Sequence, residues 1–137
     1  MSATPYAFVA IAGSGTIATG LAAVATTSSS KVMLLVRSEG SAARALAAVE
    51  KACRRIAGAD PARVSATLDL SDLAAADLLV EAIIEDHTTK ASLLKQVAEA
   101  APAADLATTT SSLSVTGLGR DSGVPERVYG LHVFNPV

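Results

Sequence analysis

The sequence predicts an α/β domain with a doubly wound, mainly parallel six-stranded sheet. Apolar runs alternate with helical patterns along the chain, which is the signature of repeated βαβ units. A glycine-rich segment joins the first apolar run to the first helical stripe. The length of 137 residues suits a single domain, which we place at residues 1–137. Right-handed crossovers between successive parallel strands then favour the doubly wound arrangement.

The first strand, the glycine-rich segment and the first helix form the clearest motif. Residues 6–12 are a short apolar run, and a stripe of Ile17, Leu21 and Val24 follows at helical spacing. The segment between them has the pattern G-x-G-x-x-A, in which the first glycine permits a tight turn and the second lets the backbone approach a pyrophosphate. In this context the pattern predicts a Rossmann-type NAD(P) site, and the alternative is a glycine turn of an ordinary α/β protein. The predicted cofactor-binding residues are Gly13, Ser14, Gly15, Thr16, Ile17 and Ala18.

The remaining elements alternate in the same way. Further strands are expected at residues 31–36, 64–68, 78–84, 106–109 and 128–132. Helices are expected at about residues 41–57 and 88–101, with a short helical turn near 114–118 and an acidic turn at 69–72. Gly58 is placed to stop the first of these helices, and Asp60-Pro61 starts a turn.

Composition and charge exclude several classes of function. Half of the residues are hydrophobic but only 3% are aromatic, so the core is expected to be aliphatic. The formal charge is −2 and no basic run is present, which argues against nucleic acid and anionic membranes as partners. The lone Cys53 excludes an internal disulfide and suits a reducing compartment. We see no targeting or membrane-spanning segment, so we expect a cytoplasmic protein, and we expect no metal site.

Two polar groups of residues follow the last two predicted strands. His132 and Asn135 lie where the final apolar run ends, and ligands of open α/β sheets bind beyond the carboxyl ends of the strands. The alternative for His132 is a half-buried strand histidine held by a backbone carbonyl. Residues 108–114 form a hydroxyl-rich cluster after the preceding strand. The alternative for this cluster is an N-cap of the next short helix.

Four motifs together resemble one family. They are residues 13–18, Val80-Glu81-Ala82-Ile83-Ile84-Glu85, Thr110-Ser111-Ser112-Leu113-Ser114 and residues 130–136, and in order and spacing they resemble the 3-hydroxyacyl-CoA dehydrogenases, including the 3-hydroxybutyryl-CoA enzymes. The resemblance implies NAD(P)-dependent oxidation of an L-3-hydroxyacyl-CoA to a 3-ketoacyl-CoA, as in β-oxidation of fatty acids. It also implies an acyl-CoA substrate and, for the intact family enzyme, a homodimer.

The resemblance assigns roles to five residues. His132 matches the general base, and Ser111 matches the serine that hydrogen-bonds the reacting oxygen near the nicotinamide. Asn135 matches an asparagine that contacts the cofactor. Glu85 and Lys90 match an acid and a lysine that bracket the nicotinamide half of the cofactor. Without the resemblance, a solvated loop pair is the alternative for Glu85 and Lys90.

Three departures from the family concern its ligands. Arg37 stands where the family has the ribose-binding acid, and with Ser38 it favours the 2′-phosphate of NADP, whereas the family's usual cofactor is NAD. Thr109 replaces an asparagine. Cys53 replaces a serine that contacts coenzyme A, and Asp60-Pro61 follows where the family extends a helical hairpin. Basic residues in this helix remain available to phosphates, or form its solvated face, and they are Lys51, Arg54 and Arg55.

The fourth departure is the end of the chain at Val137. The resemblance implies a glutamate that pairs with the histidine a little further on, followed by a helical second domain that we expect this chain to lack. We therefore expect dinucleotide binding with little or no turnover, and an exposed apolar surface near Val133, Phe134 and Val137. One alternative is a non-catalytic dinucleotide-binding sensor or partner module. The other is a dehydrogenase of a hydroxy acid without coenzyme A.

Overall fold

The computed structural model describes residues 6–28 and 31–133, and within them it contains one six-stranded sheet. All five pairs of neighbouring strands are parallel, and the strand order is β3-β2-β1-β4-β5-β6. This order confirms the predicted doubly wound fold. The strands are β1 Phe8–Ala12, β2 Lys31–Leu35, β3 Val64–Thr67, β4 Leu78–Glu81, β5 Asp105–Thr108 and β6 Val128–Gly130. The helices are α1 Thr16–Thr26, α2 Glu39–Cys53, α3 His87–Ala100 and α4 Val115–Ser122, with short 3-10 helices at Pro61–Arg63 and Leu70–Leu73.

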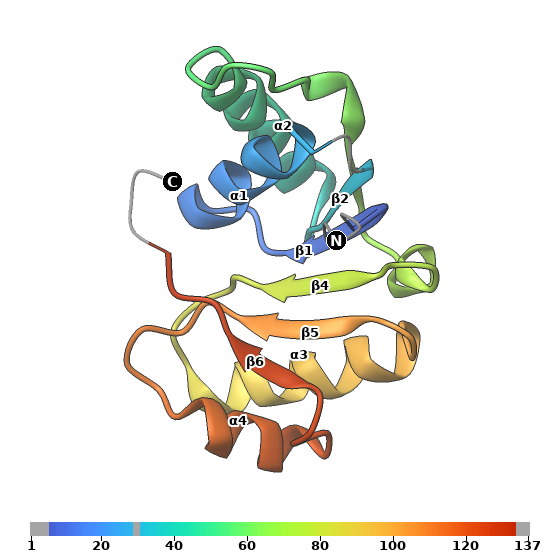
Figure 1. Ribbon diagram of the computed structural model, residues 1–137, viewed down its shortest axis with the longest axis vertical. Helices are drawn as coiled ribbons and strands as arrows, with labels where there is room; N and C mark the ends of the chain where they lie inside the picture. Colours follow the sequence, from blue (N-terminus) through green and yellow to red (C-terminus); the bar gives the residue numbers. More distant parts are fainter. Residues whose placement is uncertain (1–5, 29–30, 134–137) are drawn as a thin grey trace, which may run out of the picture.

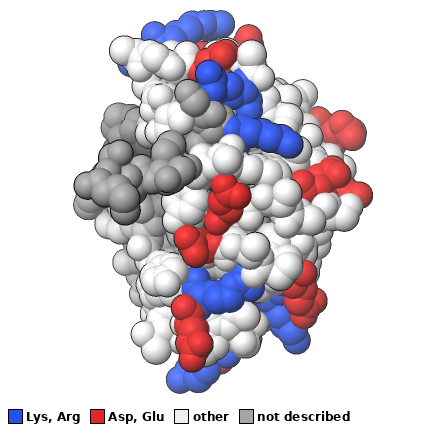
Figure 2. All heavy atoms as spheres, turned by 45° about the vertical axis from the view of Figure 1, so that its right-hand side comes forward, with Lys and Arg blue, Asp and Glu red and all other residues white. Residues whose placement is uncertain are grey.

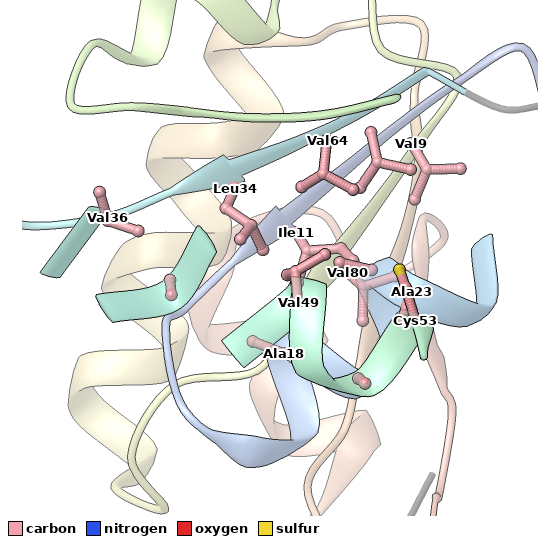
Figure 3. Close-up of a cluster of buried hydrophobic side chains, with 14 of the residues drawn as sticks. Val9, Ile11, Ala18, Ala23, Leu34, Val36, Val49, Cys53, Val64 and Val80 are labelled. Atoms are coloured by element: carbon pink, nitrogen blue, oxygen red, sulfur yellow. The ribbon is translucent and has the colours of Figure 1, made fainter. Parts of the chain in front are cut away.

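Helices cover both faces of the sheet (Figure 1). Helices α1 and α2 lie on one face, and α3 and α4 lie on the other. The central strand β1 is buried along its whole length because it contacts both layers. Val9 and Ile11 belong to the core under α1 and α2, where Figure 3 shows Ile11 and Leu34 facing Val49 of α2. Phe8 and Ala10 belong to the core under α3 and α4, as expected from the alternation of side chains along a strand.

The carboxyl ends of the strands define the ligand edge of the sheet. The order of the strands reverses between β1 and β4, because the chain crosses from β3 at one edge to β4 beside β1. In a doubly wound sheet this reversal opens a crevice between the loops that follow the two strands. The loops after β1, β4, β5 and β6 all leave the sheet at this edge, on the left of Figure 1.

Two predicted strands end two or more residues earlier than the sequence suggested. Strand β4 ends at Glu81 and not at residue 84, because the next residues turn out of the sheet and Ile84 is 65% exposed. The amide of Ile83 bonds to the Glu81 side chain, 2.9 Å away, and not to a neighbouring strand. Strand β6 ends at Gly130, so His132 lies in the loop that follows it. Apolar character alone does not separate a strand from the loop that follows it, which is why the prediction overran.

The helix boundaries also differ. Helix α2 begins at Glu39, two residues before the predicted start, because the hydroxyl of Ser38 accepts a hydrogen bond from the amide of Ser41 and caps the helix. It ends at Cys53, and the predicted last turn to residue 57 is not α-helical. Helix α4 is longer than the predicted turn and ends at Ser122, and its C-cap Gly123 adopts φ 83°. The predicted acidic turn is the 3-10 helix Leu70–Leu73.

The surface carries both signs of charge. In Figure 2 lysine and arginine side chains lie among aspartate and glutamate side chains over the visible face. Among the helices of residues 6–28 and 31–133, none is long and apolar enough to cross a bilayer. The same residues contain no cluster of three or more histidine, cysteine, aspartate or glutamate side chains that could hold a metal ion.

Candidate functional site

The glycine turn after β1 leaves the start of α1 open. Gly13 has φ 137°, which favours glycine, and its amide donates to the carbonyl of Leu35 at 3.0 Å. Gly15 is the N-cap of α1 and offers no side-chain hydrogen bond, and the first turn carries no acid. A Cβ added at Gly15 would meet no atom within 4 Å. Main-chain N–H groups at the start of the helix are therefore available to an anion, and a diphosphate fits this position.

The other residues of the turn lie around this opening. Ser14 and Thr16 are exposed, Ile17 is half-buried, and Ala18 is fully buried. The Cβ of Ala18 would lie 3.3 Å from a Cβ placed on Gly13, so both small residues are needed where the helix meets the strand. The turn also borders a hollow between α1 and α2 whose lining includes Lys51 of α2 and Arg55, which follows this helix.

Arg37 and Ser38 follow β2, and both were predicted to bind the cofactor. Arg37 is exposed just beyond the strand. The hydroxyl of Ser38 is engaged with the amide and the hydroxyl of Ser41, both at 3.0 Å, so it serves first as a helix cap. Glu39, which the sequence interpretation missed, lines a second hollow with Thr67 and Asp69. The sequence does indicate Glu39, because a serine followed directly by an acid is typical of the start of a helix.

Glu85 is the centre of the site, because it gathers the hydroxyl-rich loop after β5. Its carboxylate accepts hydrogen bonds from the amide and hydroxyl of Ser111, at 2.9 and 3.1 Å, and from the amide and hydroxyl of Ser112, at 3.2 and 3.1 Å. The hydroxyl of Thr110 donates a fifth at 2.8 Å. Desolvation raises the pKa of Glu85, but these hydrogen bonds outweigh it and lower the pKa to about 2. Ser114 caps α4, so only this member of the cluster fits the N-cap alternative.

Lys90 is buried, so the alternative of a solvated loop pair is wrong. Its side chain is 1% exposed, and its ammonium lies 2.5 Å from Glu81 Oε2, 3.2 Å from the carbonyl of Ile83 and 3.5 Å from Glu85 Oε1. Lys90 thus supports Glu85 from the interior, and any effect on a cofactor would pass through Glu85. The sequence interpretation missed Glu81, although a carboxylate inside an apolar strand signals a buried partner.

Ser111 and His132 follow neighbouring strands at the same edge. Ser111 comes after β5 and His132 after β6, and both are exposed. The alternative of a half-buried strand histidine is therefore wrong. Exposed apolar residues border this part of the sheet, namely Leu131 at 37% and Tyr129 at 59%. Val133 is half-buried, and Phe134, Asn135 and Val137 lie outside the described residues.

Cys53 does not take the place of a ligand-contacting serine. Its side chain belongs to the core under α2, as Figure 3 shows, and burial raises the pKa of its thiol. Lys51 in the last turn of the same helix is exposed, and so are Arg54 and Arg55 directly after it. Any contact between this helix and coenzyme A would therefore use the basic residues and not the thiol.

Comparisons with known proteins identify similar sequences and similar folds. A family model described as "3-hydroxyacyl-CoA dehydrogenase, NAD binding domain" matches residues 8–137. The chain is 36% identical over 143 residues to the 3-hydroxyadipyl-CoA dehydrogenase of Escherichia coli K12, covering 93% of this chain and 29% of that protein. It is 31% identical over 140 residues to a 3-hydroxybutyryl-CoA dehydrogenase of Clostridioides difficile, covering 94% and 50%. The crystal structure of (S)-3-hydroxybutyryl-CoA dehydrogenase from Ralstonia eutropha aligns with a TM-score of 0.87 at 29% identity, covering 96% of this chain and 50% of that one. The chain thus spans half or less of the length of these proteins.

Proposed function

The chain belongs to the 3-hydroxyacyl-CoA dehydrogenase family, and we propose that it supplies the dinucleotide-binding part of an enzyme that interconverts 3-hydroxyacyl-CoA and 3-ketoacyl-CoA. The observation that carries the proposal is the position of Ser111. This serine is fixed by Glu85 at the carboxyl edge of the sheet, one strand away from His132 and on the same edge as the open glycine turn. A cofactor laid across this edge would bring its ring to the two polar side chains.

The residues at this edge can divide the reaction between them. When bound, the nicotinamide accepts the hydride that leaves C3 of the substrate. His132 takes the proton of the 3-hydroxyl group, because an imidazole accepts and returns a proton near neutral pH. The hydroxyl of Ser111, which donates to Glu85 at 3.1 Å, would turn to donate to the reacting oxygen of the substrate, while the amide of Ser111 keeps its hydrogen bond to Glu85. Asn135 would add a contact to the cofactor.

Arg37 favours NADP over NAD. Among the described residues it has no ion-pair partner, so its guanidinium is available to a 2′-phosphate at the end of β2. Ser38 contributes less than the sequence suggested, because its hydroxyl caps α2. The carboxylate of Glu39, in the first turn of α2, repels the 2′-phosphate of NADP and so reduces the preference for NADP over NAD.

Lys51 and Arg55 attract the phosphate groups of the coenzyme A thioester. Both line the hollow between α1 and α2 that also includes Gly15 and Thr16. Two cations next to an uncapped helix start give this hollow a positive potential.

Fluorescence titration with NADH tests the proposed function. The 137-residue chain is expected to bind NADH saturably, and Gly15→Val is expected to weaken binding by about tenfold or more, because its side chain would fill the space reserved for the diphosphate. Thermal unfolding of both proteins serves as the control, and their melting temperatures should agree closely. Absence of saturable binding to the wild-type chain would overturn the proposal.

A further inference from the structure

Glu81 and Lys90 form an ion pair in the interior, next to the candidate site. Their side chains are 0% and 1% exposed, and Lys90 Nζ lies 2.5 Å from Glu81 Oε2. Glu81 is the last residue of β4, and Lys90 lies on the buried face of α3. Taking both charges out of water is costly, and apolar residues of similar volume often stabilise a fold as well or better. Stability alone therefore does not explain why this ion pair is buried at the edge of the candidate site.

Glu81 links the end of β4 to two further parts of the ligand edge, strand β5 and the loop after β4. It accepts a hydrogen bond from the hydroxyl of Thr108 in β5, at 2.5 Å, and from the amide of Ile83 in the loop after β4, at 2.9 Å. The amide of Thr109 bonds to the main-chain carbonyl of Glu81 at 3.0 Å. One residue thus holds together the ends of β4 and β5 and the loop at residues 82–86.

Lys90 lies between two carboxylates. Its ammonium is 2.5 Å from Glu81 and 3.5 Å from Glu85, and it also donates to the carbonyl of Ile83 at 3.2 Å. Because Glu81 holds the ammonium more closely, the carboxylate of Glu85 is left to the donors of Ser111 and Ser112. Without the charge of Glu81, the nearest carboxylate to the ammonium would be that of Glu85, which would then be drawn inward.

We propose that Glu81 is a positioning residue for the cofactor site, which acts by holding Lys90 beneath Glu85 so that Glu85 faces the loop of Ser111 and Ser112. This inference rests on the proposed function, in which Ser111 would form a hydrogen bond to the reacting oxygen. The chain of contacts runs from Glu81 to Lys90, from Lys90 to Glu85 and from Glu85 to Ser111.

The test uses Glu81→Gln and Glu81→Gln/Lys90→Met in the whole 137-residue chain. The single variant keeps the shape of Glu81 and leaves Lys90 without its partner, so it is expected to lower the melting temperature. The double variant removes both charges. The glutamine oxygen can accept from the amide of Ile83 while its NH₂ group donates to the hydroxyl of Thr108, so the melting temperature is expected near that of the wild type. In both variants the ¹H–¹⁵N resonances of Ser111 and Ser112 are expected to shift, and NADH binding to weaken by about tenfold, the effect of losing about one hydrogen bond.

Two controls separate positioning from general stability. Glu85→Gln should shift the same two amide resonances, because it alters their acceptor directly. Arg127→Ala loosens the far end of α3 and should lower the melting temperature without moving the Ser111 and Ser112 resonances. A folded double variant with unmoved resonances and wild-type NADH affinity would overturn the inference, as would a single variant that behaves like Arg127→Ala. If the wild type fails to bind NADH, the proposed function falls, but the amide resonances still decide the positioning of Glu85.

Discussion

Gly13 packs directly against the main-chain carbonyl of Ala82, so that a Cβ on Gly13 would overlap the carbonyl oxygen. The two residues follow β1 and β4, between which the order of the strands reverses. The contact draws the glycine turn against the loop that carries Glu85. Gly15, two residues later, faces open space instead. Gly13 is therefore required by the fold, and Gly15 leaves space for the ligand.

Gly13→Ala is expected to destabilise the fold, and Gly15→Ala is not. At Gly13 a side chain meets both the positive φ and the carbonyl of Ala82, and strain of this kind costs about 2 kcal/mol or more. At Gly15 the free energy of unfolding should change by about 0.5 kcal/mol or less, while the affinity for NADH falls. Urea unfolding and NADH titration of the two variants check this. Equal stabilities of the two variants would contradict the assignment.

Glu85 is expected to make stability depend on acid pH. Its folded pKa of about 2 lies below the ordinary 4.5, so its contribution is present above about pH 4.5 and disappears as the pH falls towards 2. Glu85→Gln should therefore lower the melting temperature at neutral pH and narrow its gap to the wild type as the pH falls. Glu99→Gln, at an exposed position of α3, is the matched control and should follow the wild type. A gap that stays constant from pH 7 to pH 2 would exclude this role.

Arg37→Asp is expected to reverse the preference between the two nicotinamide cofactors. A charge-assisted hydrogen bond to a 2′-phosphate contributes about 1.5–3 kcal/mol, which corresponds to about tenfold or more in affinity. The aspartate would repel the phosphate and accept from the ribose hydroxyls. Fluorescence titrations with NADPH and NADH at one moderate salt concentration measure the ratio, with Arg120→Asp on α4 as the control. Wild-type binding of NADH that equals or exceeds that of NADPH would refute the preference.

Arg127→Ala is expected to destabilise the protein without changing its affinity for ligands. The guanidinium donates to the carbonyls of Ala98, Ala101 and Ala104, at 3.3, 3.0 and 2.7 Å, where α3 ends and the chain turns into β5. Ala101 and Ala104 are buried, so their carbonyls would lose partners that water does not replace fully. A loss of about 1–3 kcal/mol is expected in urea unfolding. Unchanged stability would show that these carbonyls find other donors.

Local patterns in the sequence were enough to predict the fold class and the glycine turn. Parallel strands alternating with helices leave a periodic apolar pattern, and the requirement for glycine at Gly13 is local to one turn, so both can be read from neighbouring residues. His132 and the hydroxyl-rich cluster were named because each follows a predicted strand, whereas Glu85 and Lys90 were named from the family resemblance. The roles of His132, Asn135 and Arg37 are still predictions.

The ends of the strands and the contacts that hold the site together depend on the tertiary structure. The end of β4 at Glu81 depends on a hydrogen bond from Ile83 to the Glu81 side chain, which no apolar pattern reveals. The five donors around Glu85 come from a loop some 26 residues away, and Lys90 is buried because two carboxylates meet its ammonium. Contacts of this kind form when strands that are distant in the chain become neighbours in the sheet. The hydrophobic periodicity of the sequence therefore does not indicate them.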